Sequence, residues 1–234
     1  MKIVFTPDWF LSGDVFVEIF SFAILFLFFV LSIRSYKLTK NKNSFYLGLG
    51  FMLIALAELA TILTKLVLYY DFYTIAIPNI GNFIVEQQII NSTDIFYFTG
   101  FFFHKLFTLI GFYLIYRLTS KEKLSGDILL VLFFITVSTL FSNTFYYLFH
   151  LIALILLFLI INNYGKIYKK NKSTNTKILI IAFSILTLSQ MIFLISKVKF
   201  LYVVAQLNQL ISYMILLILI IRILKLPNSH VYNP

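Results

Sequence analysis

Cysteine is absent from this 234-residue sequence, and charged residues are scarce. Without cysteine the chain forms no disulfide, no thiolate metal site and no iron–sulfur cluster, and it carries no haem or lipid attached through sulfur. Asp, Glu, Lys and Arg make up 12% of the residues, whereas a typical soluble domain has about 25%. Hydrophobic residues make up 61%. This composition excludes an ordinary soluble domain.

Long polar stretches are lacking as well. The apolar residues come in blocks of about 20, which is the length that a helix needs to cross roughly 30 Å of hydrocarbon at 1.5 Å per residue. The polar stretches between the blocks are too short for a separate catalytic or signalling domain. We therefore expect an all-α, polytopic protein of the cell membrane, with one multi-pass domain over residues 1–234 and the lipid bilayer as its surroundings.

Seven transmembrane helices are expected, and the basic residues predict their direction. The predicted spans are 15–33, 45–69, 95–116, 128–142, 145–161, 178–196 and 200–221. Lys and Arg gather after the first, third, fifth and seventh spans, and most acids lie on the other side. Because basic loops stay in the cytoplasm, the N-terminus is expected outside and the C-terminus in the cytoplasm. This placement also explains the net charge of +10 without any nucleic acid as partner.

A repeat is suggested by two apolar runs that align without a gap. Leu47–Tyr70 overlays Leu179–Tyr202 at an offset of 132 residues, which places Glu58 on Gln190. The same offset places Glu18 on His150. The sequence therefore predicts a 3+1+3 parallel repeat, a layout known among transporters: a first half (1–117), a linking helix (118–144) and a second half (145–225). The alternative is chance alignment of apolar helices.

Ionisable and amide side chains inside the spans are the candidate ligand-binding residues. A charged group in a span costs several kcal/mol on insertion scales, so it normally faces the bundle interior and has a partner. The candidates all fall in the outer half of the predicted bilayer: Glu18, Glu58, Lys65, His104, Lys105, His150, Gln190, Gln206 and Gln209. We expect a polar cavity there. The alternative is that polar side chains only hold helices together, with Glu58 paired to Lys65 or Lys105.

Helical spacing groups these residues into stripes, because positions three or four apart share a face. The predicted stripes are Glu58, Thr61 and Lys65 on the second span; Gly100, His104, Thr108 and Gly111 on the third; Thr136, Thr139 and Asn143 on the fourth; and Tyr202, Gln206, Gln209 and Tyr213 on the seventh. Glycine and threonine stripes are also typical of helix packing.

Metal and enzyme chemistry are not expected. His104 and His150 could ligate a haem iron or, with Glu18 and Glu58, a transition metal. Each span has only one such histidine and there is no second pair, so we expect no metal, no cofactor and only hydrogen-bonded histidines. The chain has no metalloprotease or nucleophile-elbow motif, so we expect no catalytic residues and no enzyme.

The predicted function is transport of a small polar or charged solute. Glu58 would be the coupling carboxylate, and Gln190, Gln206 and Gln209 would orient the solute. One alternative is a seven-helix sensor that binds a ligand and signals to a separate cytoplasmic partner. A membrane subunit of a larger complex is another. The sequence leaves open whether the chain forms a homo-oligomer.

Overall fold

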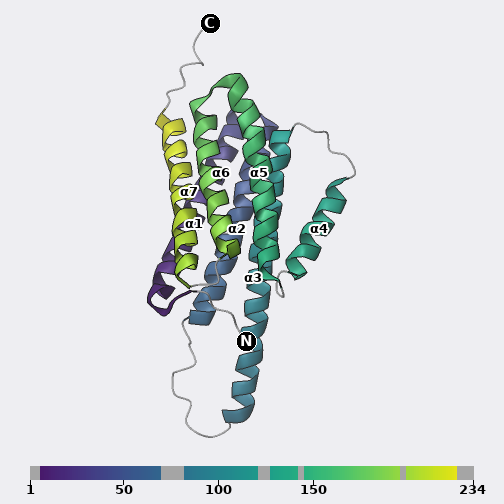
Figure 1. The fold of residues 1–234 in the computed structure, drawn as a ribbon, viewed down its shortest axis with the longest axis vertical. Helices are drawn as coiled ribbons and strands as arrows, with labels where there is room; N and C mark the ends of the chain where they lie inside the picture. The colour runs from purple at the N-terminus through teal and green to yellow at the C-terminus, as the bar shows by residue number, and fades with distance from the viewer. Residues whose placement is uncertain (1–5, 70–81, 121–126, 142–144, 196–198, 226–234) are drawn as a thin grey trace.

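The chain folds into a helical bundle (Figure 1). The computed structural model describes residues 6–69, 82–120, 127–141, 145–195 and 199–225. These residues form one short 3₁₀ helix and seven α-helices: η1 (Asp8–Phe10), α1 (Leu11–Thr39), α2 (Lys42–Tyr69), α3 (Asn82–Ser120), α4 (Asp127–Phe141), α5 (Tyr146–Asn171), α6 (Thr174–Ile195) and α7 (Lys199–Lys225). In the described part of the chain, six α-helices are long and apolar enough to cross a membrane. The protein is therefore a multi-pass helical membrane protein.

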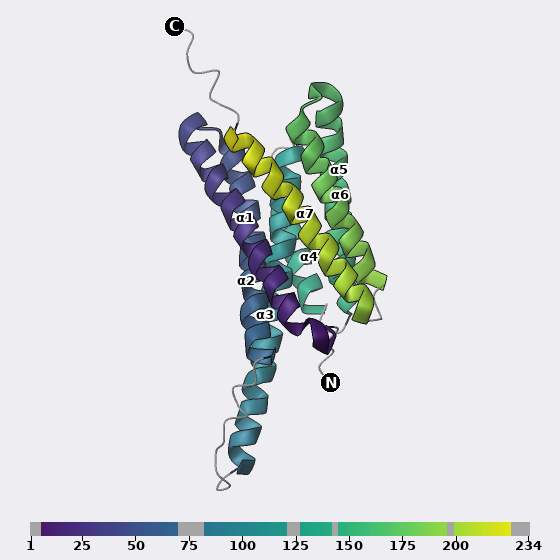
Figure 2. The same ribbon diagram turned by 90° about the vertical axis from the view of Figure 1, so that its left-hand side faces the viewer.

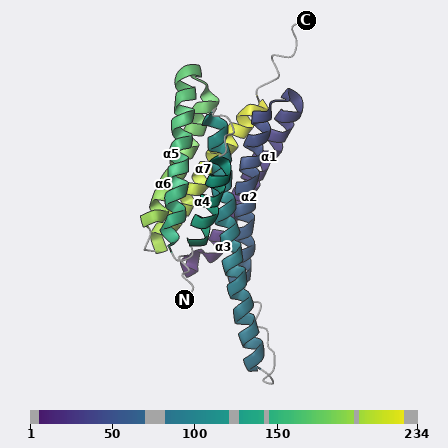
Figure 3. The same ribbon diagram turned by 90° about the vertical axis from the view of Figure 1, so that its right-hand side faces the viewer.

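The six long helices form a closed circuit of neighbours. Within a first unit α2 packs against α1 and α3, and within a second unit α6 packs against α5 and α7. The units meet at two seams, where α1 packs against α7 and α3 packs against α5. Figure 2 shows α1 and α7 running alongside each other, and Figure 3 shows α5 and α6 beside α3. We call these helix sets the first unit (α1–α3) and the second unit (α5–α7).

Helix α4 is the exception to this packing. It has 15 residues and lies outside the circuit, against α3 and α5 (Figure 1). It matches the predicted fourth span in position but is shorter than the six spanning helices. In its threonine stripe, the Thr136 and Thr139 hydroxyls donate to carbonyl oxygens of α4 itself. Asn143 lies outside the described residues.

Helix α3 is longer than the sequence predicted. The predicted third span began at residue 95, but α3 begins at Asn82 and continues for 39 residues. Its first turns extend beyond the other helices (Figure 2). The physical reason is local: residues 82–94 contain neither proline nor glycine, the two residues that disfavour a helix most strongly. The polar residues in this stretch are therefore not enough to prevent a helix.

The same turn is built once in each unit. Helix α1 ends at Lys40, which has φ 55° and donates its backbone N–H to the Tyr36 carbonyl oxygen at 2.8 Å. Helix α5 ends at Lys172, which has φ 46° and donates to the Tyr168 carbonyl oxygen at 2.8 Å. A left-handed residue other than glycine costs about 1–2 kcal/mol. Helices α2 and α6 begin two residues after these lysines.

Glycines bring α2 and α3 into backbone contact. A Cβ atom placed on Gly111 would lie 2.9 Å from the Gly50 carbonyl oxygen, and one on Gly50 would lie 3.2 Å from the Gly111 carbonyl oxygen. A Cβ atom on Gly100 would lie 1.6 Å from Thr64 Oγ1. Small residues permit such close approach between membrane helices. The glycines of the predicted third stripe therefore serve helix packing.

The bundle is apolar on its surface and through most of its core. Phe51, Phe112 and Phe183 are among the fully buried side chains. Large apolar side chains also face outwards, such as Phe16, which is 72% exposed, and Phe133, which is 61% exposed. Contiguous exposed apolar surface is unfavourable in water, whereas lipid tails accommodate it. Buried ion pairs lie near the start of α1, where Lys65 contacts Asp14 and Glu18.

Candidate functional site

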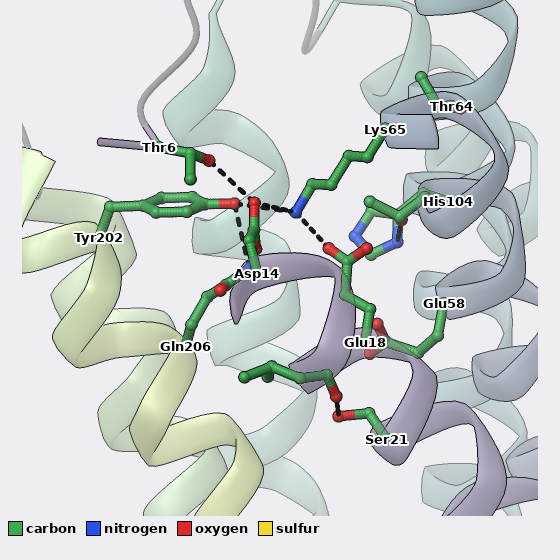
Figure 4. Close-up of polar contacts among 12 residues, drawn as sticks. Thr6, Asp14, Glu18, Ser21, Glu58, Thr64, Lys65, His104, Tyr202 and Gln206 are labelled. Carbon is green, nitrogen blue, oxygen red and sulfur yellow. Dashed lines mark hydrogen bonds and ion pairs between the residues drawn. The ribbon is translucent and has the colours of Figure 1, made fainter. Parts of the chain in front are cut away.

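A buried ionic network lies at the seam between α1 and α7, and Lys65 of α2 is at its centre. The Lys65 side chain is 3% exposed. Its Nζ forms ion pairs with Asp14 Oδ2 at 2.7 Å and with Glu18 Oε1 (Figure 4). Asp14 and Glu18 are four residues apart on α1, so both carboxylates lie on one helix face. Lys65 therefore points into the bundle and does not extend to the surface.

Asp14 is the residue that the sequence analysis missed. The predicted first span began at Val15, which left Asp14 in an acidic tail. In the structure Asp14 lies in α1 and is fully buried. A buried carboxylate is tolerated when a cation and hydrogen-bond donors surround it. Lys65 provides the cation, and the Thr6 hydroxyl donates to Asp14 Oδ2 at 2.9 Å.

Glu58 is held by the second unit. Its Oε1 accepts a hydrogen bond from Gln209 Nε2 at 2.8 Å and one from the Tyr213 hydroxyl at 3.2 Å. Both donors come from α7, whereas Glu58 comes from α2. A direct ion pair between Glu58 and Lys65, one of the alternatives, is not formed, because the ion pairs of Lys65 go to α1. Lys105 is half-buried.

Tyr202 and Gln206 of α7 complete the network. Lys65 Nζ lies 3.4 Å from the Tyr202 hydroxyl oxygen, and Gln206 Nε2 donates to the same oxygen at 3.2 Å. The Lys65 ammonium also lies 5.9 Å from the centre of the Tyr202 ring, within the range of a cation–π interaction. The network thus joins the segment before η1, two helices of the first unit and one helix of the second.

Three buried acceptor atoms of the network have no hydrogen-bond partner among the described residues. They are Asp14 Oδ1, Glu18 Oε2 and Gln206 Oε1. All three side chains are buried, so none of these atoms is open to bulk solvent. An unsatisfied buried acceptor costs about 1–3 kcal/mol. All three atoms accept hydrogen bonds when their groups are ionised or neutral amides, so each calls for a donor.

The formal charges of the network do not balance. Asp14, Glu18 and Glu58 are three buried carboxyl groups, and Lys65 is the ammonium that contacts two of them. These acids do not converge on one point: the described residues contain no group of three or more His, Cys, Asp or Glu side chains that could hold a metal ion. The arrangement favours binding of protons over coordination of a metal.

The two predicted histidines lie apart from this network. His104 of α3 hydrogen-bonds through Nδ1 to Thr61 Oγ1 at 2.7 Å and to the Ala57 carbonyl oxygen at 3.2 Å. Its ring centre lies 5.8 Å from that of Phe149 on α5. His104 therefore ties α3 to α2 and lies at the second seam, between α3 and α5.

His150 forms a separate neutral pair. Its Nδ1 lies 2.8 Å from Gln190 Oε1, which joins α5 to α6. Its ring stacks on Phe193, with 5.1 Å between ring centres. His150 therefore donates from Nδ1, because an amide oxygen only accepts. Each histidine has protein partners within the bundle.

The structure brings together five of the nine predicted site residues. The network contains Glu18, Glu58, Lys65, Gln206 and Gln209, whereas His104 bonds to Thr61 and His150 bonds to Gln190. Sequence spacing could have found Asp14, because it stands one helical turn before Glu18. The predicted seventh stripe is correct: all four of its members take part in the network.

An open groove lies next to the network. It has a volume of about 420 Å³ and is lined by Pro7 and Trp9 near η1 and by Lys199 and Phe200 at the start of α7. Pro7 follows Thr6, whose hydroxyl contacts Asp14. Lys199 lies one helical turn before Tyr202. The groove lining contains none of the nine predicted residues, so it is an approach to the network and not the predicted cavity.

Comparison of the chain with known protein families, with curated proteins and with solved structures gives no match. The functional conclusion therefore rests on the fold and on the geometry of the network.

Proposed function

We propose that the protein is a transporter of a small polar or charged solute, in which the first and second units move against each other. The observation that carries this proposal is the buried network at the α1–α7 seam. Its acids and its lysine belong to the first unit, whereas the amide and phenol partners of Glu58 belong to the second. Relative movement of the units therefore changes the partners of buried charges.

The pattern of helix contacts supports two equivalent units. Each contact within the first unit has a counterpart within the second: α1 with α2 corresponds to α5 with α6, and α2 with α3 corresponds to α6 with α7. The two seams, α1 with α7 and α3 with α5, correspond to each other in the same way. The turns at Lys40 and Lys172 are equivalent at the same offset of 132 residues. That offset is the one that aligns Glu58 with Gln190. Parallel repeats of this kind are a common basis for alternating access.

Glu58 is the coupling residue in this proposal. Its hydrogen-bond donors, Gln209 and Tyr213, both come from α7, so separation of the units would leave a buried carboxylate without them. A buried group without partners is costly, and a solute or a proton that takes the place of the donors offsets this cost. Solute binding would thereby favour one arrangement of the units over the other.

The test is uptake of isotopically labelled solutes into proteoliposomes that contain the full chain. The probes are one sugar, one neutral amino acid, one primary amine and one carboxylic acid. We expect at least one probe to accumulate, and we expect Glu58→Gln to abolish its accumulation. Thr136→Val is the matched control, since Thr136 is exposed on α4 and its hydroxyl bonds only within that helix.

Uptake that is equal in wild type and in Glu58→Gln would overturn the role of Glu58. Absence of uptake for every probe, together with saturable binding of one of them to the purified protein, would overturn transport. Such a result would favour the sensor, in which the same network responds to a ligand without moving it.

A further inference from the structure

We propose that Glu18 holds an exchangeable proton, which it takes up from solvent at the groove beside η1 through the chain Thr6–Asp14–Lys65. This inference deepens the proposed function, because it assigns a proton as the coupling ion of the same network. It rests on the distribution of donors around the three carboxyl groups and on the buried acceptor atom of Glu18.

The three carboxyl groups differ in the donors that they receive. Asp14 receives the Thr6 hydroxyl and Lys65 Nζ, both at Oδ2, and its buried Oδ1 accepts no hydrogen bond from the described residues. Glu58 receives Gln209 Nε2 and the Tyr213 hydroxyl. Glu18 has one donor, Lys65, which it shares with Asp14 through Oε1, and its buried Oε2 has no partner in the described residues. Because Glu18 has one shared donor and the other two carboxyl groups have two donors each, Glu18 is the carboxylate least stabilised as an anion.

Every helix packed against α1 contributes to the surroundings of Glu18. Helix α2 contributes Lys65 and Glu58, and helix α7 contributes Tyr202 and Gln206. Asp14 lies one turn before Glu18 on α1. One cation among three acids leaves a formal charge of −2 when all four groups are ionised, and charges in a membrane bundle need compensation. A proton on Glu18 Oε2 reduces the net negative charge of the network from −2 to −1. It also turns an acceptor atom without a partner into a hydrogen-bond donor.

A metal cation fits the network less well than a proton. Sodium and calcium ions are held by several converging oxygen ligands. Here the carboxylates face donor groups, namely an ammonium, two hydroxyls and an amide nitrogen. The three carboxyl groups and Lys65 are almost completely buried, and a proton needs no additional volume.

A chain of polar contacts leads to Glu18 from Thr6, the residue before groove-lining Pro7. Pro7 lines the groove, and the neighbouring Thr6 hydroxyl lies 2.9 Å from Asp14 Oδ2. Asp14 Oδ2 lies 2.7 Å from Lys65 Nζ, which in turn contacts Glu18 Oε1. Figure 4 shows Lys65 Nζ between the two carboxyl groups.

The proton transfer along this chain balances. Solvent in the groove protonates Asp14. Lys65 then gives one N–H proton to Glu18 and takes the proton of Asp14, so that one O–H bond breaks on Asp14 and one forms on Glu18. Lys65 keeps its charge, Asp14 returns to the carboxylate, and Glu18 becomes neutral. Release of the proton reverses these steps or, when the units have moved, leads to the other side.

The test is infrared difference spectroscopy of the full chain in lipid vesicles, titrated between about pH 5 and pH 9 without any solute. The readout is the carbonyl stretch of a protonated carboxyl group, which a carboxylate lacks. We expect wild type to gain this band as the pH falls and Glu18→Gln to lose it. Asp127→Asn, at the start of α4, is the control that should retain the band.

A second variant keeps the test decisive when Glu18→Gln does not fold. Lys65→Gln removes the cation and leaves three acids, so the midpoint of the titration should move to higher pH by about 1–3 units. Size-exclusion chromatography establishes that each variant is folded. A wild-type spectrum without the band would overturn the inference. So would an unchanged band in folded Glu18→Gln, or an unchanged midpoint in folded Lys65→Gln.

The choice of cation is tested separately from transport. At constant pH, replacement of choline chloride by sodium chloride should leave the band unchanged, and a band that disappears on sodium addition would assign the site to a metal cation instead. Loss of the proton band with intact solute uptake would overturn this inference and leave the proposed function standing. Absence of uptake with an intact band would overturn the proposed function and leave this inference standing.

Discussion

The two three-helix units have corresponding helices and contacts but hold themselves together by different chemistry. The first unit buries Asp14, Glu18 and Lys65 as an ionic network and brings α2 and α3 into backbone contact at glycines. The second unit buries the neutral pair of His150 and Gln190. Among the described residues, the buried side chains named here are charged in the first unit and are an imidazole and an amide in the second.

The second unit also joins its helices differently. Ser189 of α6 donates to the Ala205 carbonyl oxygen of α7 at 2.8 Å, and Ser212 of α7 donates to the Ala182 carbonyl oxygen of α6 at 2.8 Å. These reciprocal bonds take the place of the glycine contact between α2 and α3. Neutral side chains are sufficient to hold a membrane bundle, so stability alone does not require the charges of the first unit. This asymmetry favours a functional role for them.

The largest expected effect comes from removal of Lys65. Lys65→Met leaves Asp14 and Glu18 buried without their cation, and removal of one partner from a buried ion pair costs about 3–5 kcal/mol. Thermal unfolding in mild detergent should show a strongly lowered midpoint. The triple variant Asp14→Asn/Glu18→Gln/Lys65→Met should regain much of the loss, because it removes the charges together. An unfolding midpoint of Lys65→Met equal to that of wild type would contradict the ionic network.

The glycine contact gives the next largest effect. Gly111→Ala places a Cβ atom 2.9 Å from a backbone oxygen of α2, and overpacking of this kind costs about 1–3 kcal/mol. Gly165→Ala is the matched control in the second unit, because no atom lies within 4 Å of its added Cβ. Thermal unfolding of the two variants measures the difference. Equal destabilisation by both would show that the close approach of α2 and α3 does not matter.

The neutral pair should contribute less than the ionic network. A double-mutant cycle of His150→Phe and Gln190→Leu measures the coupling between the two side chains. Side-chain hydrogen bonds in membrane bundles average about 0.6 kcal/mol and reach about 1.7 kcal/mol, so we expect a coupling free energy in this range. A coupling as large as the loss in Lys65→Met would remove the contrast between the two units.

The smallest expected effect is at the serine bonds. Ser189→Ala removes one hydrogen bond between α6 and α7, and a typical hydrogen bond contributes about 0.5–1.5 kcal/mol. Ser184→Ala, at an exposed position of α6, is the control and should leave the free energy of unfolding unchanged. A destabilisation no greater than that of the control would show that apolar packing alone joins these two helices.

The spans and many of the buried polar residues could be predicted from the sequence, because each of these features depends on residues that are close together along the chain. A block of about 20 apolar residues indicates a membrane helix, and a charged residue inside it indicates an interior position. Glu18, Glu58 and Lys65 were found in this way. Helical spacing then grouped Tyr202, Gln206, Gln209 and Tyr213 on one face of α7, and the structure places these four side chains in the network.

The pairing within the network was not predictable from spacing along one helix. Glu58 and Lys65 share a face of α2, which favoured a pair between them, but the contact between α1 and α2 places Asp14 and Glu18 next to Lys65 instead. Such partners are set by which helices are neighbours. Asp14 was missed because an acid at the edge of an apolar block is typical of a solvated end, and only its burial against α2 and α7 shows otherwise.

Helix α4 has a consequence for the lipid around the protein. Its 15 residues cover about 22 Å, whereas the hydrocarbon core of a bilayer is about 30 Å thick. Lipid next to a short apolar helix thins locally, at a modest cost for each ångström of mismatch. Because α4 packs on α3 and α5, we expect the thinned lipid to border the α3–α5 side of the bundle. We therefore expect the length of the lipid acyl chains to affect this side more than the α1–α7 seam.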